Sequence, residues 1–162
     1  MLYAEIGSPA KGEELSPVAL ELIKGYDEEY RAKKKALSLL SYSDKNEVSL
    51  RRRLASAGFS REVSDRVAAE MVNLGYIDEK RQLERIILNE ANLKLRGPMK
   101  IIPALTSKGY SSEEVKTVMR ELLESGEIDF KANAKRLLEK RLPGCDDLEE
   151  KKNFLYRNGY KI

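Results

Sequence analysis

The chain has 162 residues, of which 35% are charged and 7% aromatic, and its net charge is +3. This length suits one ordinary domain or a short array of small helical units, and the abundance of Leu, Glu, Lys, Arg and Ala favours a soluble, mostly helical protein. Because the sequence has no apolar run near the roughly 20 residues that span a bilayer, and no signal-peptide pattern over residues 1–10, we expect a cytoplasmic protein that does not bind membranes.

The residues needed for catalysis are scarce. Histidine is absent and Cys145 is the single cysteine, which leaves neither a zinc-binding set nor a thiol–imidazole pair. Gly97-Pro98 lacks the following Gly-Lys-Ser/Thr of a phosphate-binding loop. We therefore expect no enzyme activity, no metal and no cofactor, and we interpret Cys145 as an ordinary thiol in a reducing compartment.

Apolar spacing and capping residues predict the elements in chain order. Residues 1–12 are rich in Gly, Ser and Pro and predict an irregular arm. Helical spacing follows over 13–23 and, after an interruption at Gly25, over 28–40. Each later helix lies between a capping residue and a Gly, Pro or similar stop, and the expected ranges are 44–58, 60–75, 78–95, 97–110, 111–126, 129–142 and 146–159.

These elements recur at a fixed distance. A glycine followed by an aromatic residue occurs at Gly58-Phe59, Gly109-Tyr110 and Gly159-Tyr160, at steps of 51 and 50 residues. A second pattern, Gly-x-Ile-Asp, begins at Gly75 and again at Gly126, which is 51 residues later. The sequence therefore predicts an all-α protein of tandem three-helix repeats of about 50 residues, forming an elongated array in which each unit buries part of its surface on its neighbours.

The repeat pattern predicts five segments. They are an irregular N-terminal arm (1–12), an acidic N-terminal helix (13–30), a first three-helix repeat (31–75), a second (76–126) and an incomplete third (127–162). Charge alternates along the chain. The segments 1–30, 31–62, 63–93, 94–110, 111–130 and 131–162 carry net charges of −5, +6, −2, +4, −4 and +4.

Basic residues recur on or beside the second helix of each predicted repeat. They are Arg51, Arg52, Arg53, Lys94, Arg96, Lys100, Lys108, Lys151, Lys152 and Arg157. One such run is more often a solvated helix face than a binding site. Its recurrence on equivalent helices nevertheless predicts a discontinuous basic track, which would meet either phosphates or an acidic protein surface.

Several motifs carry a family resemblance over about residues 31–160. They are Ala36-Leu37 through Glu47 and Leu54 to Gly58-Phe59, then Gly75-Tyr76-Ile77-Asp78-Glu79, then Gly97-Pro98 through Ile101 and Leu105 to Lys108-Gly109-Tyr110, and finally Leu155-Tyr156-Arg157-Asn158-Gly159-Tyr160. Together they resemble the RecX family of bacterial recombination regulators. The most specific part is the segment from Gly-Pro to Lys-Gly in its place after Gly-Tyr-Ile-Asp-Glu.

This resemblance implies a helical-repeat protein that regulates the RecA recombinase in DNA recombination, DNA repair and the SOS response. Members of the family bind the RecA filament, lie along its helical groove and limit its ATP hydrolysis, strand exchange and co-protease activity, and some bind DNA. Two alternatives stay open, which are a free-standing nucleic-acid-binding helical-repeat protein and a structural adaptor for another partner. Single- or double-stranded DNA is a further candidate partner. The sequence does not determine the oligomeric state.

Overall fold

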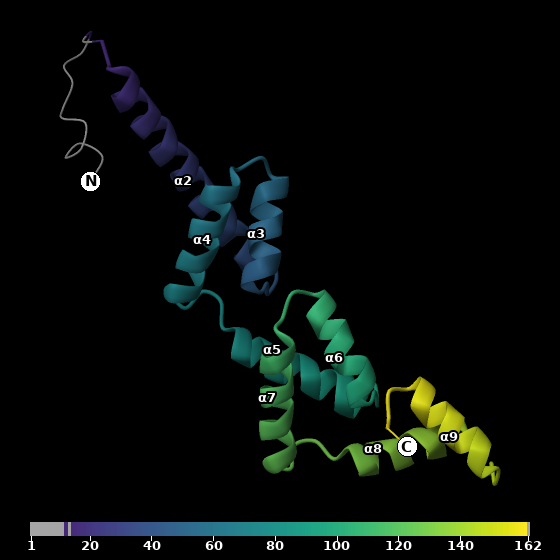
Figure 1. Ribbon diagram of the computed structural model, residues 1–162. Helices are drawn as coiled ribbons and strands as arrows, with labels where there is room; N and C mark the ends of the chain where they lie inside the picture. The colour runs from purple at the N-terminus through teal and green to yellow at the C-terminus, as the bar shows by residue number, and fades with distance from the viewer. Residues whose placement is uncertain (1–11, 13, 162) are drawn as a thin grey trace. The chain divides into compact units, whose positions relative to one another are not determined.

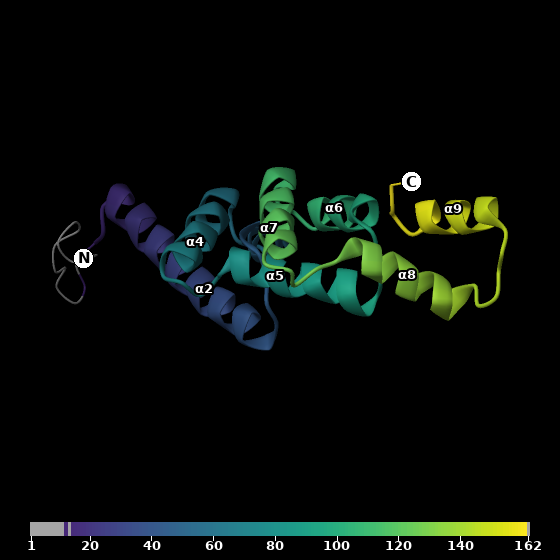
Figure 2. The same cartoon turned by 90° about the horizontal axis from the view of Figure 1, so that it is seen from below.

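The computed structural model describes residue 12 and residues 14–161, and the chain divides after Ile77 into two compact units. Helices are the only regular secondary structure in this part of the chain (Figures 1 and 2), which confirms the expected all-α class. Apart from Gly12, the arm expected over 1–12 lies outside the described residues. Over the described ranges, each helix is too short or too polar to cross a lipid bilayer.

The first unit consists of α2 (Pro17–Tyr42), α3 (Glu47–Ser56) and α4 (Arg61–Asn73) in the described residues. Side chains cap each helix, since Ser16 Oγ accepts from the Ala19 amide of α2, and Asn46 and Ser60 serve α3 and α4 in the same way. The buried core comes from all three helices and the segment after them. It contains Ala32, Ala36, Leu50, Leu54, Val63, Val67, Ala68, Met71 and Ile77.

The break predicted at Gly25 is wrong. A single helix, α2, runs through Gly25 from Pro17 to Tyr42, in place of the two helices expected over 13–23 and 28–40. Glycine inside a helix costs only about 0.5–1 kcal/mol relative to alanine. Glu28 and Glu29 lie just beyond it and bind the start of α4, because the Ser60 amide donates to Glu28 Oε1 at 2.6 Å and Arg66 Nε lies 3.3 Å from Glu29 Oε2. These contacts stabilise α2 on both sides of the predicted break, so Gly25 does not end the helix.

The second unit contains two groups of helices. Its elements are α5 (Glu79–Leu88), the π-helix η1 (Asn89–Leu93), α6 (Pro98–Ser107), α7 (Ser112–Glu124), α8 (Phe130–Arg141) and α9 (Leu148–Arg157). The larger core joins α5, η1, α6 and α7 and includes Leu83, Ile87 and Leu105. A smaller core contains Leu95, Leu137 and Tyr160 and draws in side chains from α8 and α9.

The predicted repeat is visible in the helix ends. α3, α6 and α9 each end at a glycine with positive φ, which is 93° at Gly58, 99° at Gly109 and 90° at Gly159. In each case the amide of the following aromatic residue donates to the carbonyl of the leucine five residues before it, for example Tyr110 to Leu105. The left-handed glycine and this bond together form a helix stop. The same stop at all three sites confirms the tandem repeats.

The end of α9 lies directly against the start of α6. The Gly97 amide donates to the Asn158 carbonyl at 2.9 Å, and the Met99 amide donates to the Gly159 carbonyl at 3.0 Å. The first amides of a helix have no partner within that helix, so the last carbonyls of α9 satisfy amides at the start of α6. A Cβ on Gly97 would overlap the Gly159 carbonyl, and a Cβ on Gly159 would lie 2.7 Å from the Lys100 nitrogen. We call this contact the glycine junction.

Tyr160 closes the small core beside the junction. Its hydroxyl donates to the carbonyl of Leu95 at 3.0 Å, and its ring meets Phe130 of α8 edge to face with centroids 6.3 Å apart. Burial raises the pKa of Tyr160 to about 12, so the phenol stays protonated and keeps donating at neutral pH. Leu95, Phe130 and Tyr160 thereby link α8 to the segment before α6.

The glycine junction makes a testable contribution to stability. We expect Gly97→Ala to lower the free energy of unfolding by about 1–3 kcal/mol, because the added methyl group forces the two backbones apart. Gly25→Ala is the matched control: a methyl group at position 25 would have no neighbour within 4 Å, and we expect it to stabilise α2 by about 0.4–1 kcal/mol. Urea denaturation of both variants measures the difference. Equal effects of the two substitutions would contradict the close approach at Gly97.

Candidate interaction surface

The arginine run on α3 divides into one paired and two available side chains. Arg51 Nε lies 3.3 Å from Asp65 Oδ1 of α4, so its charge is balanced inside the first unit. Arg52 and Arg53 are exposed, and within the described residues neither forms an ion pair. Of the three predicted site residues on this helix, Arg52 and Arg53 are therefore the ones able to meet a partner's charge.

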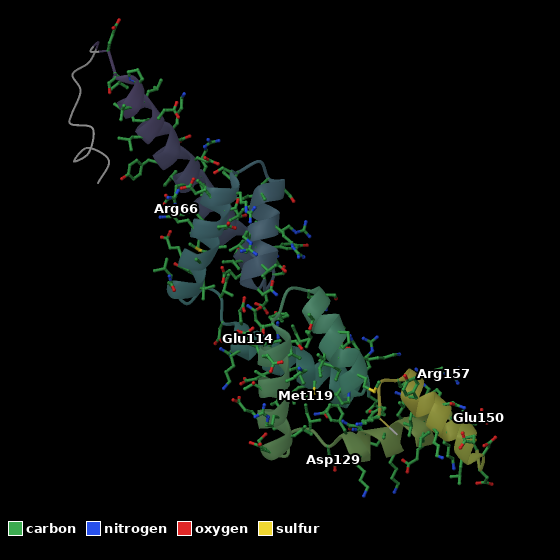
Figure 3. The ribbon with its side chains drawn as sticks, viewed as in Figure 1. Arg66, Glu114, Met119, Asp129, Glu150 and Arg157 are labelled. Atoms are coloured by element: carbon green, nitrogen blue, oxygen red, sulfur yellow. The ribbon has the colours of Figure 1, made fainter. Side chains whose placement is uncertain are left out.

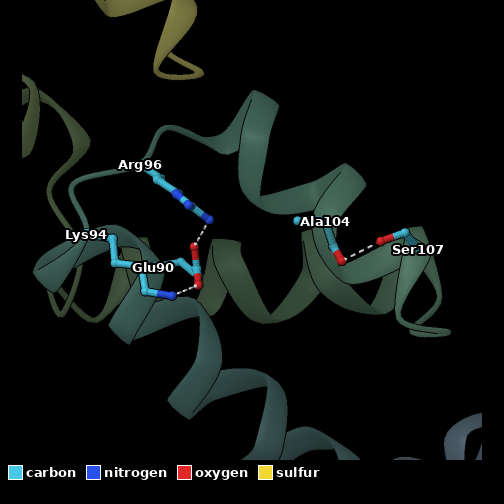
Figure 4. A network of polar contacts seen from close by, with 5 residues as sticks. All are labelled: Glu90, Lys94, Arg96, Ala104 and Ser107. Atoms are coloured by element: carbon cyan, nitrogen blue, oxygen red, sulfur yellow. Dashed lines mark hydrogen bonds and ion pairs between the residues drawn. The ribbon is translucent and has the colours of Figure 1, made fainter.

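Lys94 and Arg96 are held by a buried carboxylate before α6. Glu90 is only 8% exposed, and its two oxygens accept from Lys94 Nζ at 2.6 Å and Arg96 Nη1 at 2.7 Å (Figure 4). The Arg96 amide also donates to the Glu90 carbonyl at 2.9 Å. We call these three residues the Glu90 cluster. Lys94 and Arg96, which were predicted as site residues, thus stabilise the turn between η1 and α6 within the protein.

The sequence analysis did not predict the ion pairs of Glu90, because of the segments over which net charge was summed. The basic segment was counted from position 94 and the acidic segment up to position 93, so Glu90 and its two partners fell into different sums. An acid four residues before Lys94 is the spacing of neighbours on a helix and was the available signal. The π-helix η1, which the apolar pattern did not predict, carries Glu90.

The Glu90 cluster also sets the protonation of its acid. Burial alone raises the pKa of Glu90, but the hydrogen bond from Lys94 and the charge of Arg96 outweigh burial and hold the pKa below its ordinary value of 4.5. Glu90 is therefore ionised at neutral pH. The cluster carries a net charge of +1, which is less than the two free cations that the sequence suggested.

The remaining predicted site residues lie on α6 and α9. Lys100 and Lys108 are exposed, and Lys100 lies beside Gly159 at the glycine junction. The three cations on α9 are all partly engaged. Lys152 Nζ is 3.1 Å from Glu149 Oε1, and Arg157 Nε donates to the Asn153 carbonyl at 3.3 Å. Lys151 is half-buried. The structure thus brings the ends of α6 and α9 together within the second unit. A continuous track over α3, α6 and α9 stays a prediction.

The densest set of exposed cations is on α8, which the sequence analysis did not select. Its members are Lys131, Lys135, Arg136, Lys140 and Arg141. Glu139 is the only acidic residue between positions 131 and 141, whereas positions 142–162 hold four basic and four acidic residues. The whole net charge of +4 in the last segment therefore belongs to α8. Summing the charge of residues 131–141 separately from that of 142–162 would have revealed the basic surface of α8.

Other chemistry is limited in the described part of the chain. There, no group of three or more His, Cys, Asp or Glu side chains is arranged to hold a metal ion. The Cys145 thiol lies 3.3 Å from Glu150 Oε2, and burial together with this hydrogen bond raises its pKa. A raised pKa keeps the thiol protonated at neutral pH, which agrees with its interpretation as an ordinary thiol.

Curated relatives share one name. Regulatory protein RecX of Clostridioides difficile (strain 630) is 27% identical over 144 residues, which cover 89% of this chain and 66% of that protein. Regulatory protein RecX of Trichlorobacter lovleyi is 28% identical over 136 residues, covering 78% of this chain and 85% of that protein. This chain covers only 41% of the regulatory protein RecX of Lactobacillus johnsonii, to which it is 28% identical over 112 residues. No protein-family model matches the chain.

Two solved structures have the same fold. The crystal structure of RecX from Lactobacillus salivarius superposes with a TM-score of 0.70 at 18% identity and covers 85% of this chain and 91% of that chain. A crystal structure of regulatory protein RecX gives a TM-score of 0.78 at 19% identity and covers 99% of this chain and 80% of that chain. Both likenesses support the helical-repeat fold described above.

Removing the charge of Glu90 tests the cluster. We expect Glu90→Gln to cost about 1–2 kcal/mol at neutral pH, because two charge-assisted hydrogen bonds lose their anion. The folded-state pKa lies below 4.5, so this stabilisation is present above about pH 4.5 and disappears as the pH falls through the folded-state value. Urea denaturation from about pH 7 to about pH 3.5 should therefore show a weaker loss of stability in acid for the variant than for the parent.

The control for this experiment is Glu124→Gln on α7. Glu124 is exposed and makes no ion pair among the described residues, so its neutralisation should leave both the stability and the acid dependence nearly unchanged. If Glu90→Gln behaved like Glu124→Gln, the Glu90 cluster would contribute nothing to folding.

Proposed function

The chain belongs to the RecX family, and from this premise we propose that it is a non-enzymatic regulator of the RecA recombinase. It binds the filament that RecA forms on DNA and inhibits it, and so acts in DNA recombination and DNA repair. The observation that carries this proposal is the match to regulatory protein RecX along 89% of the chain. The helical-repeat fold, with exposed cations on equivalent helices, supports it.

Binding alone is sufficient for this kind of regulation. A protein shifts another between two states only by as much as it binds one state more tightly. An inhibitor of the filament's ATP turnover must therefore bind the slowly hydrolysing arrangement better than the active one. Such binding requires a surface and no catalytic group.

The exposed cations on the second helices are the proposed contact surface in each unit. In the first unit they are Arg52 and Arg53, whereas Arg51 already balances Asp65. In the second unit they include Lys100, next to the glycine junction. A filament on DNA presents phosphates and protein side chains, and both can pair with these cations.

The arginine pair on α3 provides the test. In a RecA ATPase assay on single-stranded DNA, the parent protein should lower ATP turnover and co-sediment with filaments at low salt. Arg52→Ala with Arg53→Ala should raise the concentration needed for half-inhibition roughly tenfold, which corresponds to about 1.4 kcal/mol of lost binding. Both side chains are exposed on a helix, where alanine is well tolerated, so thermal stability should not change.

The matched control is Arg61→Ala. The Arg61 side chain is 95% exposed at the first position of α4 and lies outside the proposed surface. It should inhibit as the parent does. Unchanged ATP turnover and no co-sedimentation by the parent protein would refute the proposal. Binding to DNA with no effect on RecA would favour the alternative, a free-standing nucleic-acid-binding protein.

A further inference from the structure

Several charges on the described helices occur in opposite pairs one turn apart. Residues three or four positions apart on a helix are neighbours, and opposite charges there stabilise it. Pairs of this kind are Glu21–Lys24, Asp27–Arg31, Glu29–Lys33, Glu113–Lys116 and Glu149–Lys152, with N–O distances between 2.8 and 3.1 Å. α8 differs in its charge balance, because five cations share this helix with a single acid.

On α8, like charges are neighbours. Lys131 is four residues before Lys135, and Arg136 is four residues before Lys140. Like charges at this spacing repel each other and weaken a helix. The only acid on the helix, Glu139, lies 3.9 Å from Lys135 Nζ. Apart from the pair with Glu139, the cations of α8 therefore have no acidic neighbour on their own helix.

The helix dipole accounts for some of these cations but not for the others. Lys140 and Arg141 lie in the last turn, where positive charge is favourable. Lys131 lies in the first turn, where positive charge is unfavourable, and that turn contains no acid. Lys131, Lys135 and Arg136 are therefore the cations that the dipole does not explain.

The opposite side of α8 is firmly anchored. Asn133 is buried and donates to Asn92 Oδ1 at 2.9 Å, while Asn92 donates to the Glu127 carbonyl at 2.8 Å. Leu137 is buried in the small core with Tyr160. Because the inner side is fixed, the backbone that carries the cations of the outer side is held in place. Figure 3 shows side chains with nitrogen atoms at their tips extending from the helix that follows the labelled Asp129. A preorganised surface loses less entropy on binding.

The outer side of α8 suits a linear chain of phosphates better than an acidic protein. It consists of charged side chains around the exposed Ala132, with no large apolar group. Protein interfaces usually need an apolar core that is depleted of charge. A phosphodiester backbone needs only cations at regular steps, and helix neighbours supply them at about 5–6 Å. The single aromatic residue of α8, Phe130, is packed against Tyr160, so α8 presents no aromatic ring on which a nucleic-acid base could stack.

We propose that the outer face of α8, formed by Lys131, Lys135, Arg136 and Lys140 around Ala132, binds the phosphodiester backbone of nucleic acid independently of base sequence. Its role in regulation rests on the proposed function, since the face would supply a DNA contact in the filament. The binding itself requires no RecA and can be measured with the chain alone.

The direct test is fluorescence anisotropy with a labelled oligo-dT and with a duplex of equal length. The triple variant Lys131→Gln, Lys135→Gln and Arg136→Gln should weaken binding at least tenfold. Its slope of log affinity against log salt should fall by about 0.7 per lost phosphate contact on the single strand or about 0.9 on the duplex. The oligonucleotide with the larger change identifies the preferred form.

A charge-matched control separates this site from overall charge. Lys24→Gln, Arg31→Gln and Lys116→Gln remove the same number of cations, all from opposite-charge pairs elsewhere. This control should retain most of the affinity. Equal losses in the two triple variants would reduce the binding to a net-charge effect and overturn the site.

Ala132→Glu tests the same face without removing any cation. Ala132 is in the first turn of α8, where an acid is favourable, so this variant should be at least as stable as the parent. It should still weaken DNA binding, because its carboxylate lies among the cations. Unchanged affinity would refute the proposal. So would equally tight binding of poly-glutamate, since that would make the face a general acceptor of acidic chains.

The outcome is separable from that of the proposed function. Loss of DNA binding in the α8 variants with no effect of the parent protein on RecA ATPase supports the α8 site and refutes RecA regulation. RecA inhibition by the parent, with DNA affinity unaffected by the α8 variants, refutes the α8 site and leaves the regulator in place.

Discussion

The second unit depends on the contact between two glycines. Because Gly97 and Gly159 lack side chains, the last carbonyls of α9 reach amides at the start of α6 and satisfy groups that a helix cannot satisfy itself. α8 and α9 share only a small core with Leu95, so the position of α9 relies on this contact and on Tyr160, while α8 is also held by the hydrogen bond from Asn133 to Asn92. Repeat proteins gain stability in this way, from the interfaces between neighbouring units.

Ion pairing within the protein decides which basic residues are available to a partner. Thirty basic and 27 acidic side chains nearly cancel in the total, so their arrangement matters more than their number. Arg51 is balanced by Asp65, and Glu90 holds both Lys94 and Arg96. Arg52, Arg53, Lys100 and most of the cations on α8 form no ion pair among the described residues. A partner that recognises positive charge would meet these residues first, since a charge already paired offers little further gain.

Local rules were enough to predict the repeat but could not predict long-range pairing. Glycine stops and side-chain caps act within a few residues, so the glycine-terminated helix ends and the repeat of about 50 residues could be predicted from the sequence. The start of α3 was placed at 44, whereas Asn46 caps it, and the helix expected over 78–95 continues after Leu88 as the π-helix η1. Gly25 misled because Glu28 and Glu29 bind α4, contacts that no local pattern contains. The ion pairs of Glu90 and the basic surface of α8 were missed because charge was summed over segments that did not coincide with the helices. The basic track across the repeats and the exact segment boundaries stay predictions.

The central claim is that this chain contacts a RecA filament on DNA through specific basic faces. A lysine-reactivity footprint tests it most directly: the chain is acylated alone and on filaments assembled on single-stranded DNA, and each lysine is quantified by mass spectrometry. We expect Lys100, Lys131 and Lys135 to become protected on the filament, while Lys24, which pairs with Glu21 on α2, keeps its reactivity. Unchanged reactivity of all the lysines, or protection of Lys24 alone, would contradict the claim.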